Sequence, residues 1–152
     1  MEKDQLFKLR RFNIIMGALH FIQGIAMIFL ATTVIQNIAA FKPSIIQLYL
    51  TFDPQTQSLV SASRTLFDLP FGLFVASFLL LSAFFHGLIA LPKSLNSIYN
   101  RDLAKGINKF RWFEYALSSS IMIVLISTLF GIYDIASLIL IFIVNATMNL
   151  FG

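Results

Sequence analysis

The feature that most constrains this chain is its apolar run from Phe12 to Val34. The run exceeds the roughly 20 helical residues that cross the hydrocarbon core of a bilayer. Three further apolar segments follow, at about 70–91, 112–130 and 135–151. With 58% hydrophobic and 12% charged residues, the 152-residue chain is too apolar for a soluble domain of this size. The sequence therefore predicts an all-α transmembrane helical bundle with four spanning helices, forming one domain over residues 1–152.

The loop between the first two predicted spans, residues 36–69, differs in composition and periodicity. Apolar residues alternate with polar ones along its first half, at Ile46, Leu48, Leu50 and Phe52. A period of two is typical of a β-strand, Pro54 suits the second position of a type I turn, and residues 58–63 suit a returning strand. We therefore expect a β-hairpin that packs on the helices or on a second subunit, because a two-stranded ribbon is marginally stable alone.

Three residues mark predicted helix ends. Pro70 suits the first turn of the second span, Pro92 suits the position just past its end, and Asp134 is placed to cap the fourth span. The stretch from Pro92 to Lys109 is predicted to be a polar connector that becomes helical from about Asn100.

Basic residues are distributed unequally among the predicted loops. The long first loop has only Lys42 and Arg64, and the 131–134 link has none. The N-terminal tail and the second connector are much richer, with Lys3, Lys8, Arg10 and Arg11 in the tail and Lys93, Arg101, Lys105, Lys109 and Arg111 in and beside the connector. Both basic regions are therefore expected to face the cytoplasm, with the hairpin outside. We therefore attribute the net charge of +4 to membrane topology and do not expect a nucleic-acid partner.

Glu114 lies just inside the third apolar segment. At about 100° per residue, Arg111, Glu114 and Ser118 share one narrow sector of a helix, so this sector is predicted to face away from lipid. An ionisable residue in a spanning helix is a functional-site hypothesis by default. A carboxylate held ionised by Arg111 suits a counterion or a proton relay.

Polar side chains on the first two spans are predicted to reach the same cytoplasmic half of the membrane. His20 and Gln23 share a stripe with Asn13, Gly17 and Gly24 on the first span, and Ser82 lies four residues before His86 on the second. The alternatives are structural: close helix packing for the glycines, and hydrogen bonds between helices for the histidines. The same alternative holds for Asn145 and Asn149, which share a face of the fourth span.

Several function classes are excluded or disfavoured. The chain has no Cys, which excludes disulfides and thiolate catalysis. No nucleophile–base triad or phosphate-binding loop is visible, and the two histidines lie on different spans, so we expect neither an enzyme nor a metal site.

The polar residues of the spans also occur in patterns that resemble one known family. The first two spans contain His20-x-x-Gln23-Gly24 and Ser82-x-x-x-His86, and the last two contain Arg111-Trp112-x-Glu114-Tyr115-x-x-Ser118-Ser119-Ser120-x-Met122, Gly131-Ile132 and Asn145-Ala-x-Met148-x-x-x-Gly152. These patterns resemble the first four helices of heliorhodopsins. The resemblance runs the full length of the chain, including the long first loop, and the cytoplasmic N-terminus expected above matches the inverted orientation of that family.

The resemblance implies a retinal photoreceptor of seven helices in the cell membrane, usually homodimeric, with all-trans retinal as its chromophore. By position, Glu114 would be the counterion of the protonated retinal Schiff base, with Ser82 hydrogen-bonding nearby. Tyr115, Ser118, Ser119, Met122 and Asn145 would lie along the retinal pocket. His20, His86, Gln23, Asn108 and Arg111 would belong to a polar cavity on the cytoplasmic side.

One departure from the family pattern concerns lysine. The Schiff-base lysine of the family belongs to the seventh helix, whereas every lysine here lies in a tail or loop. We therefore expect this sequence to be the N-terminal part of a larger protein that lacks its C-terminal helices, or a product that does not bind retinal covalently. Light sensing is the first functional hypothesis; a light-gated proton channel or transporter and a ligand-free four-helix scaffold are the alternatives.

Overall fold

The computed structural model describes residues 3–34, 37 and 40–151. Its helices are α1 (Lys3–Phe29), which continues as the π-helical turn η1 (Leu30–Val34), then α3 (Phe71–Ala90), α4 (Lys93–Leu103), α5 (Lys109–Leu129) and α6 (Ile135–Leu150). Its strands are β1 (Ser44–Asp53) and β2 (Ser58–Asp68). The first helix begins earlier than the apolar run, because polar residues extend it: Lys8 pairs with Asp4 at 2.6 Å, four residues apart.

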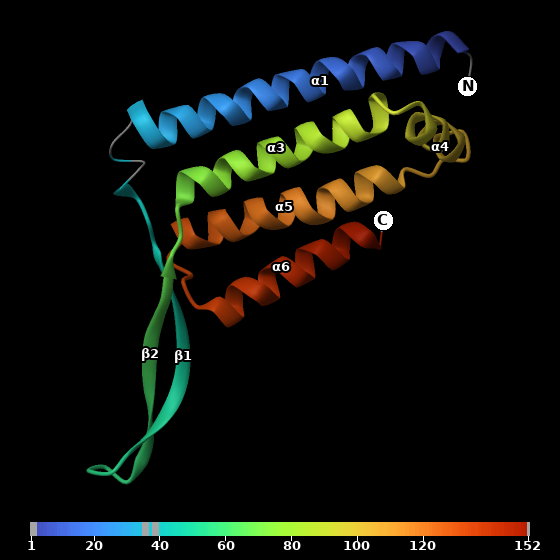
Figure 1. The fold of residues 1–152 in the computed structure, drawn as a ribbon. Helices are drawn as coiled ribbons and strands as arrows, with labels where there is room; N and C mark the ends of the chain where they lie inside the picture. Colours follow the sequence, from blue (N-terminus) through green and yellow to red (C-terminus); the bar gives the residue numbers. More distant parts are fainter. Residues whose placement is uncertain (1–2, 35–36, 38–39, 152) are drawn as a thin grey trace.

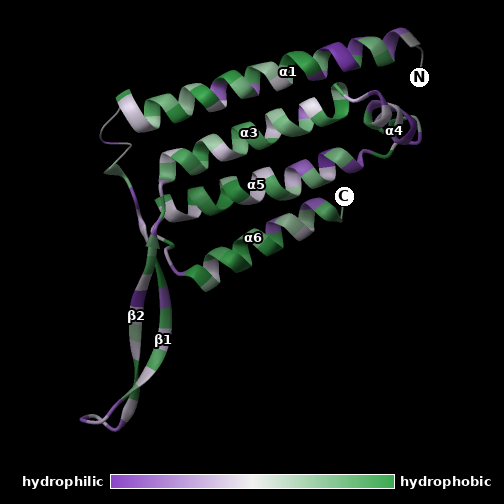
Figure 2. Cartoon of the chain, in the orientation of Figure 1, coloured by the Kyte–Doolittle hydropathy of each residue, from purple (hydrophilic) through white to green (hydrophobic). Residues whose placement is uncertain are grey.

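The four long helices lie side by side in one row, in the order α1, α3, α5, α6, and each packs on its neighbour (Figure 1). The hairpin extends from one end of the row, whereas the N-terminus, α4 and the C-terminus lie at the other. Hydrophobic residues cover the long helices, and hydrophilic ones gather in the first turns of α1 and in α4 (Figure 2). The chain is thus a helical, membrane-type protein with a small sheet.

Three helical segments are long and apolar enough to cross a membrane: Asp4–Val34, Phe71–Ala90 and Lys109–Leu129. The fourth apolar helix, α6, has 16 residues. It agrees with the predicted segment 135–151 to within one residue, but it is shorter than the roughly 20 residues that a full crossing needs. Within the described residues, the expectation of four spans therefore rests on α6, which is short for that role.

The predicted hairpin is confirmed and is longer than expected. β1 and β2 are antiparallel, with Asp53 opposite Ser58 next to the turn and Ser44 opposite Asp68 at the base. The base packs on the helices, since Ile45 and Leu69 are buried together with Leu125 of α5 and Leu138 of α6. The outer part does not, because Leu48, Leu50, Phe52 and Leu59 are all more than half exposed.

Asp134 joins the hairpin to α6 and caps that helix as predicted. Its side chain accepts hydrogen bonds from the Ser137 N–H at 2.9 Å and from the Leu48 N–H at 3.2 Å. These two backbone donors, Ser137 first, lower the pKa of Asp134 below its usual value. The adjacent Tyr133 carbonyl accepts from the Ile46 N–H at 3.0 Å. Together, the bonds of β1 to Tyr133 and Asp134 hold the base of the hairpin against the link between α5 and α6.

Residues 100–103 of the connector are helical, as predicted, but the helix begins earlier than expected. A separate helix, α4, begins at Lys93, directly after Pro92, and is seen nearly end-on in Figure 1. Asn96 ties it to α3 by donating to the Ile89 carbonyl at 2.8 Å. α4 ends at Leu103, and the turn that follows contains Gly106, whose φ of +75° is incompatible with a right-handed helix. The residues before α5 therefore form a turn where a helix was expected.

Candidate functional site

The centre of the candidate site is an ion pair near the start of α5. Arg111 Nη1 lies 2.9 Å from Glu114 Oε2, and the Glu114 side chain is only 4% exposed, against 26% for Arg111. The predicted polar sector is confirmed, because Glu114, Ser118 and Leu125 are all buried on one side of α5. The acid is therefore held inside the helix row with its charge neutralised by an arginine that still reaches solvent.

A second polar group joins α1 to α3. His86 is buried, and its Nδ1 lies 2.9 Å from Asn13 Oδ1 on α1. The His20 and His86 rings stack with their centroids 5.7 Å apart, and His20 Nδ1 lies 3.2 Å from Gln23 Oε1. α3 packs on both α1 and α5, so this group and the Arg111–Glu114 pair lie on three successive helices of the row.

Close helix packing makes this meeting of α1 and α3 possible. A Cβ atom added at Gly17 would lie 3.1 Å from His86 Cβ, and one added at Gly24 would lie 2.6 Å from Leu80 Cδ2. Both glycines therefore allow the two backbones to approach, as the structural interpretation of the sequence predicted. That approach places Asn13 within hydrogen-bonding distance of His86.

The residues predicted to line the retinal pocket separate into two groups on α5. Ser118 is buried on the Glu114 side and donates to the Glu114 carbonyl at 2.8 Å. Tyr115 and Met122 are 47% and 42% exposed and lie on another side of the helix. The guanidinium of Arg111 is 5.6 Å from the centroid of the Tyr115 ring, so Arg111 connects the two sides.

Asn145 of α6 contacts α5 through two hydroxyl groups. Its amide donates to Ser119 Oγ at 2.8 Å and to Ser120 Oγ at 3.0 Å, and Asn149 donates to Ser119 Oγ at 3.1 Å. The interhelical alternative for the two asparagines is therefore confirmed. Ser120, which is fully buried, was not singled out from the sequence, because nothing in the run of three serines distinguishes the one that faces α6.

Two other predicted site residues have different surroundings. Asn108 is the N-cap of α5, where its side chain accepts from the Arg111 N–H at 3.3 Å. Ser82 is half-buried on α3, and its hydroxyl makes no hydrogen bond to any residue that the structure describes. Asn108 thus positions the first turn that carries Arg111, whereas the Ser82 hydroxyl is free to bind another group.

The comparison with known families agrees with this geometry. No curated protein matches the chain. The family model described as heliorhodopsin matches residues 9–152, which include every site residue described above. The chain therefore belongs to the heliorhodopsins, a family of retinal-binding, light-responsive membrane proteins.

Proposed function

We propose that residues 1–152 form the first four helices of a seven-helix, light-sensing heliorhodopsin, in which Glu114 is the counterion of the retinal chromophore. The observation that carries the proposal is the burial of Glu114 beside Arg111 on α5, which packs against the helix that bears the buried His86. A buried carboxylate is costly unless a cation compensates it, so its retention in a spanning helix favours a functional role.

The side chains present fit retinal in three respects. Glu114 supplies a negative charge inside the helix row, and the free Ser82 hydroxyl supplies a hydrogen-bonding group. Tyr115 and Met122 supply exposed apolar surface against which an apolar ligand can pack. Retinal, when bound, supplies light absorption through a conjugated chain that carries a positive charge.

Each residue then has a specific task. Glu114 supplies the negative charge that stabilises a cation at this depth, and Arg111, which is partly in solvent, balances that charge from the other side. The Ser118 hydroxyl donates to the Glu114 carbonyl within α5, whereas the Asn145 amide joins α6 to α5 through Ser119. The histidine pair, being on α1 and α3, is better placed to receive a proton than to set the charge opposite the chromophore.

Covalent attachment of retinal needs a lysine inside the membrane. The six lysines, at positions 3, 8, 42, 93, 105 and 109, all lie outside the four apolar runs. The proposal therefore requires further helices from the same protein, and these would cover the apolar residues that the single row leaves exposed on α5 and α6.

We further propose that the N-terminus is cytoplasmic and that the hairpin contributes to a homodimer at the outer surface of the cell membrane. Support comes from the cationic tail and connector at one end of the row and from the exposed apolar side chains of the hairpin at the other. An apolar ribbon of this kind buries its side chains only against a partner.

Whole-cell photocurrents from the complete protein with all-trans retinal test this function. A visible pigment without a stationary photocurrent supports the sensor. A light-gated proton current that disappears in His86→Ala would instead support a channel, for which the stacked histidines and Glu114 would be the relay. A colourless protein that ignores retinal would support a scaffold and contradict the proposal.

A further inference from the structure

A groove of about 770 Å³ lies along the contact between α1 and α3, and its walls include neither Glu114 nor Arg111. Its walls are almost entirely apolar, and its one polar wall residue, Asn13, is already bonded to His86. The groove runs over two to three turns of each helix and ends where α3 meets α4, with walls formed by Asn13, Ile14, Gly17, Ala18, Phe21, Leu80, Ala83, Phe84, Gly87, Leu88, Leu91 and Pro92.

Gly87 lies in the wall of this groove, although helix packing does not require a glycine there. A Cβ atom added at Gly87 would meet only Leu91 Cδ1, at an ordinary contact distance of 3.7 Å. Gly17 and Gly24, in contrast, have no room for a Cβ because α1 and α3 touch at those positions. A glycine inside an exposed helix costs roughly 1 kcal/mol relative to alanine, so the empty space at Gly87 is not explained by the stability of the fold.

The end of the groove is positively charged. Arg10 Nε donates to the Ala90 carbonyl at 2.8 Å, which places this guanidinium beside the groove residue Leu91, and Lys93 directly follows the groove residue Pro92. Within the described residues no carboxylate pairs with Arg10 or Lys93, since the only ion pairs there are Lys8–Asp4, Arg101–Asp102 and Arg111–Glu114. An apolar groove that ends at two cations, neither of them paired with a carboxylate among the described residues, matches a molecule with an apolar chain and an anionic head.

We propose that this groove binds one anionic phospholipid, with an acyl chain between α1 and α3 and its phosphate-containing headgroup at Arg10 and Lys93. The apolar walls alone do not select a lipid, because the surrounding acyl chains are equally apolar. The charge at the end of the groove is therefore what distinguishes an anionic lipid from a zwitterionic one, and the shape of the groove is what retains one molecule. This site does not involve retinal or Glu114.

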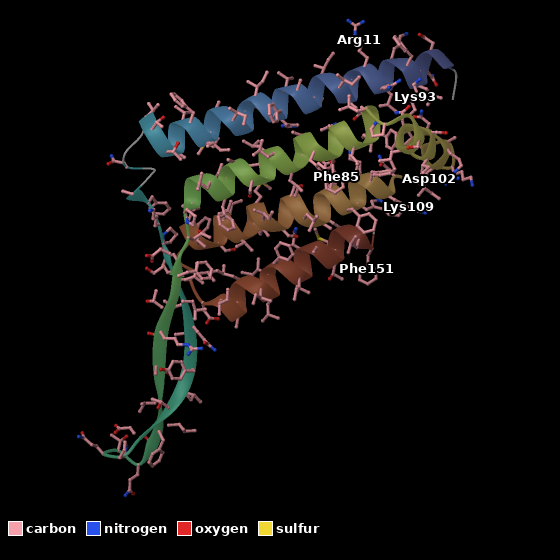
Figure 3. All side chains as sticks on the ribbon, viewed as in Figure 1. Arg11, Phe85, Lys93, Asp102, Lys109 and Phe151 are labelled. Atoms are coloured by element: carbon pink, nitrogen blue, oxygen red, sulfur yellow. The ribbon has the colours of Figure 1, made fainter. Side chains whose placement is uncertain are left out.

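Arg11 provides a matched control for the charge. Figure 3 shows the Arg11 side chain projecting from α1 away from the other helices, whereas Lys93 lies where α3 joins α4. A general attraction between a basic protein surface and anionic lipid would depend equally on both cations. A specific site depends on Lys93, which adjoins the groove, and much less on Arg11. One Lys or Arg close to an anionic headgroup is worth about 1 kcal/mol, or roughly five-fold in binding.

Native mass spectrometry of the purified complete protein tests the proposal. The protein is equilibrated with equal amounts of phosphatidylglycerol and phosphatidylcholine that carry identical acyl chains. We expect one phosphatidylglycerol to be retained preferentially, a roughly five-fold loss of this preference in Lys93→Gln, and a change of less than two-fold in Arg11→Gln. Gly87→Leu, which fills the groove, should abolish retention, whereas Gly87→Ala should preserve it.

Ala18→Leu fills the same groove from α1, so the test does not depend on whether one variant folds. Circular dichroism and the thermal unfolding midpoint show whether each variant is folded. Equal retention of the two lipids by the wild type, or equal effects of Lys93→Gln and Arg11→Gln, would overturn the proposal. So would unchanged lipid retention when both folded leucine variants fill the groove. If those variants instead dissociated a dimer while lipid retention stayed the same, the groove would belong to a second copy of the chain.

Discussion

The Arg111–Glu114 pair should respond asymmetrically to removal of either partner. Arg111→Gln leaves a carboxylate that is only 4% exposed without its cation, whereas Glu114→Gln leaves an arginine that is 26% exposed and able to reach water. Loss of one partner of a buried ion pair costs about 3–5 kcal/mol. We expect about 3 kcal/mol for Arg111→Gln, at the low end because the pair is near solvent, and about 1 kcal/mol for Glu114→Gln, whose amide oxygen still accepts from Arg111.

A double-mutant cycle measures this coupling. Free energies of unfolding of the purified protein, without retinal, are compared for the wild type, the two single variants and the double variant. Because the double variant leaves no charge buried, it should be more stable than Arg111→Gln alone, giving a coupling of about 1–3 kcal/mol. Equal costs for the two single variants, or additivity within about 0.5 kcal/mol, would refute the assignment of Glu114 as a buried charge neutralised by Arg111.

Three further results are expected. Gly24→Ala should destabilise the protein by about 1–3 kcal/mol through overpacking against α3, whereas Gly87→Ala should be neutral or stabilising; thermal unfolding distinguishes them. Asp134→Ala should be less stable than the wild type at neutral pH. Because donated hydrogen bonds lower the pKa of the Asp134 carboxyl below its usual value, the difference should persist at pH 5 and shrink only as the carboxylate protonates in stronger acid. A difference already lost at pH 5 would contradict that. Deleting residues 47–58 should weaken a dimer in detergent, measured by light scattering, without changing helix content; an unchanged dimer argues against the hairpin as an interface.

The sequence predicted the elements whose signals are local. Hydrophobic length located the long helices, alternation located the hairpin, and the position of Asp134 before an apolar run identified a cap that the structure confirms. It did not place the start of α4 at Lys93, although Leu95, Ile98, Tyr99 and Leu103 recur there at helical spacing. What periodicity does not give is the burial of Tyr99, whose ring centroid lies 6.1 Å from that of Phe110 on α5. Contacts of this kind depend on the path of the chain after Gly106.

The sequence predicted which residues belong to the candidate site, but not which residues on other helices they contact. Helical periodicity correctly placed Arg111, Glu114 and Ser118 in one sector, since this depends on a single helix. The partners of His86 and Asn145 lie on other helices, so the contacts with Asn13 and Ser120 depend on rotation and depth that periodicity does not determine. Arg10, which binds the end of α3, was counted only as a topological charge for the same reason.

The role of Glu114 is tested most directly by the absorption maximum of the complete, retinal-bound protein. A carboxylate at this position stabilises the ground state, in which the positive charge is localised near it, more than the excited state, in which that charge spreads along the conjugated chain. Glu114→Gln should therefore shift absorption to the red, and acidification of the wild type should produce a similar shift as the carboxylate is neutralised, whereas His20→Ala and His86→Ala should change photocycle kinetics more than colour. An absorption maximum unchanged in Glu114→Gln would contradict the counterion assignment and leave Glu114 as a structural partner of Arg111.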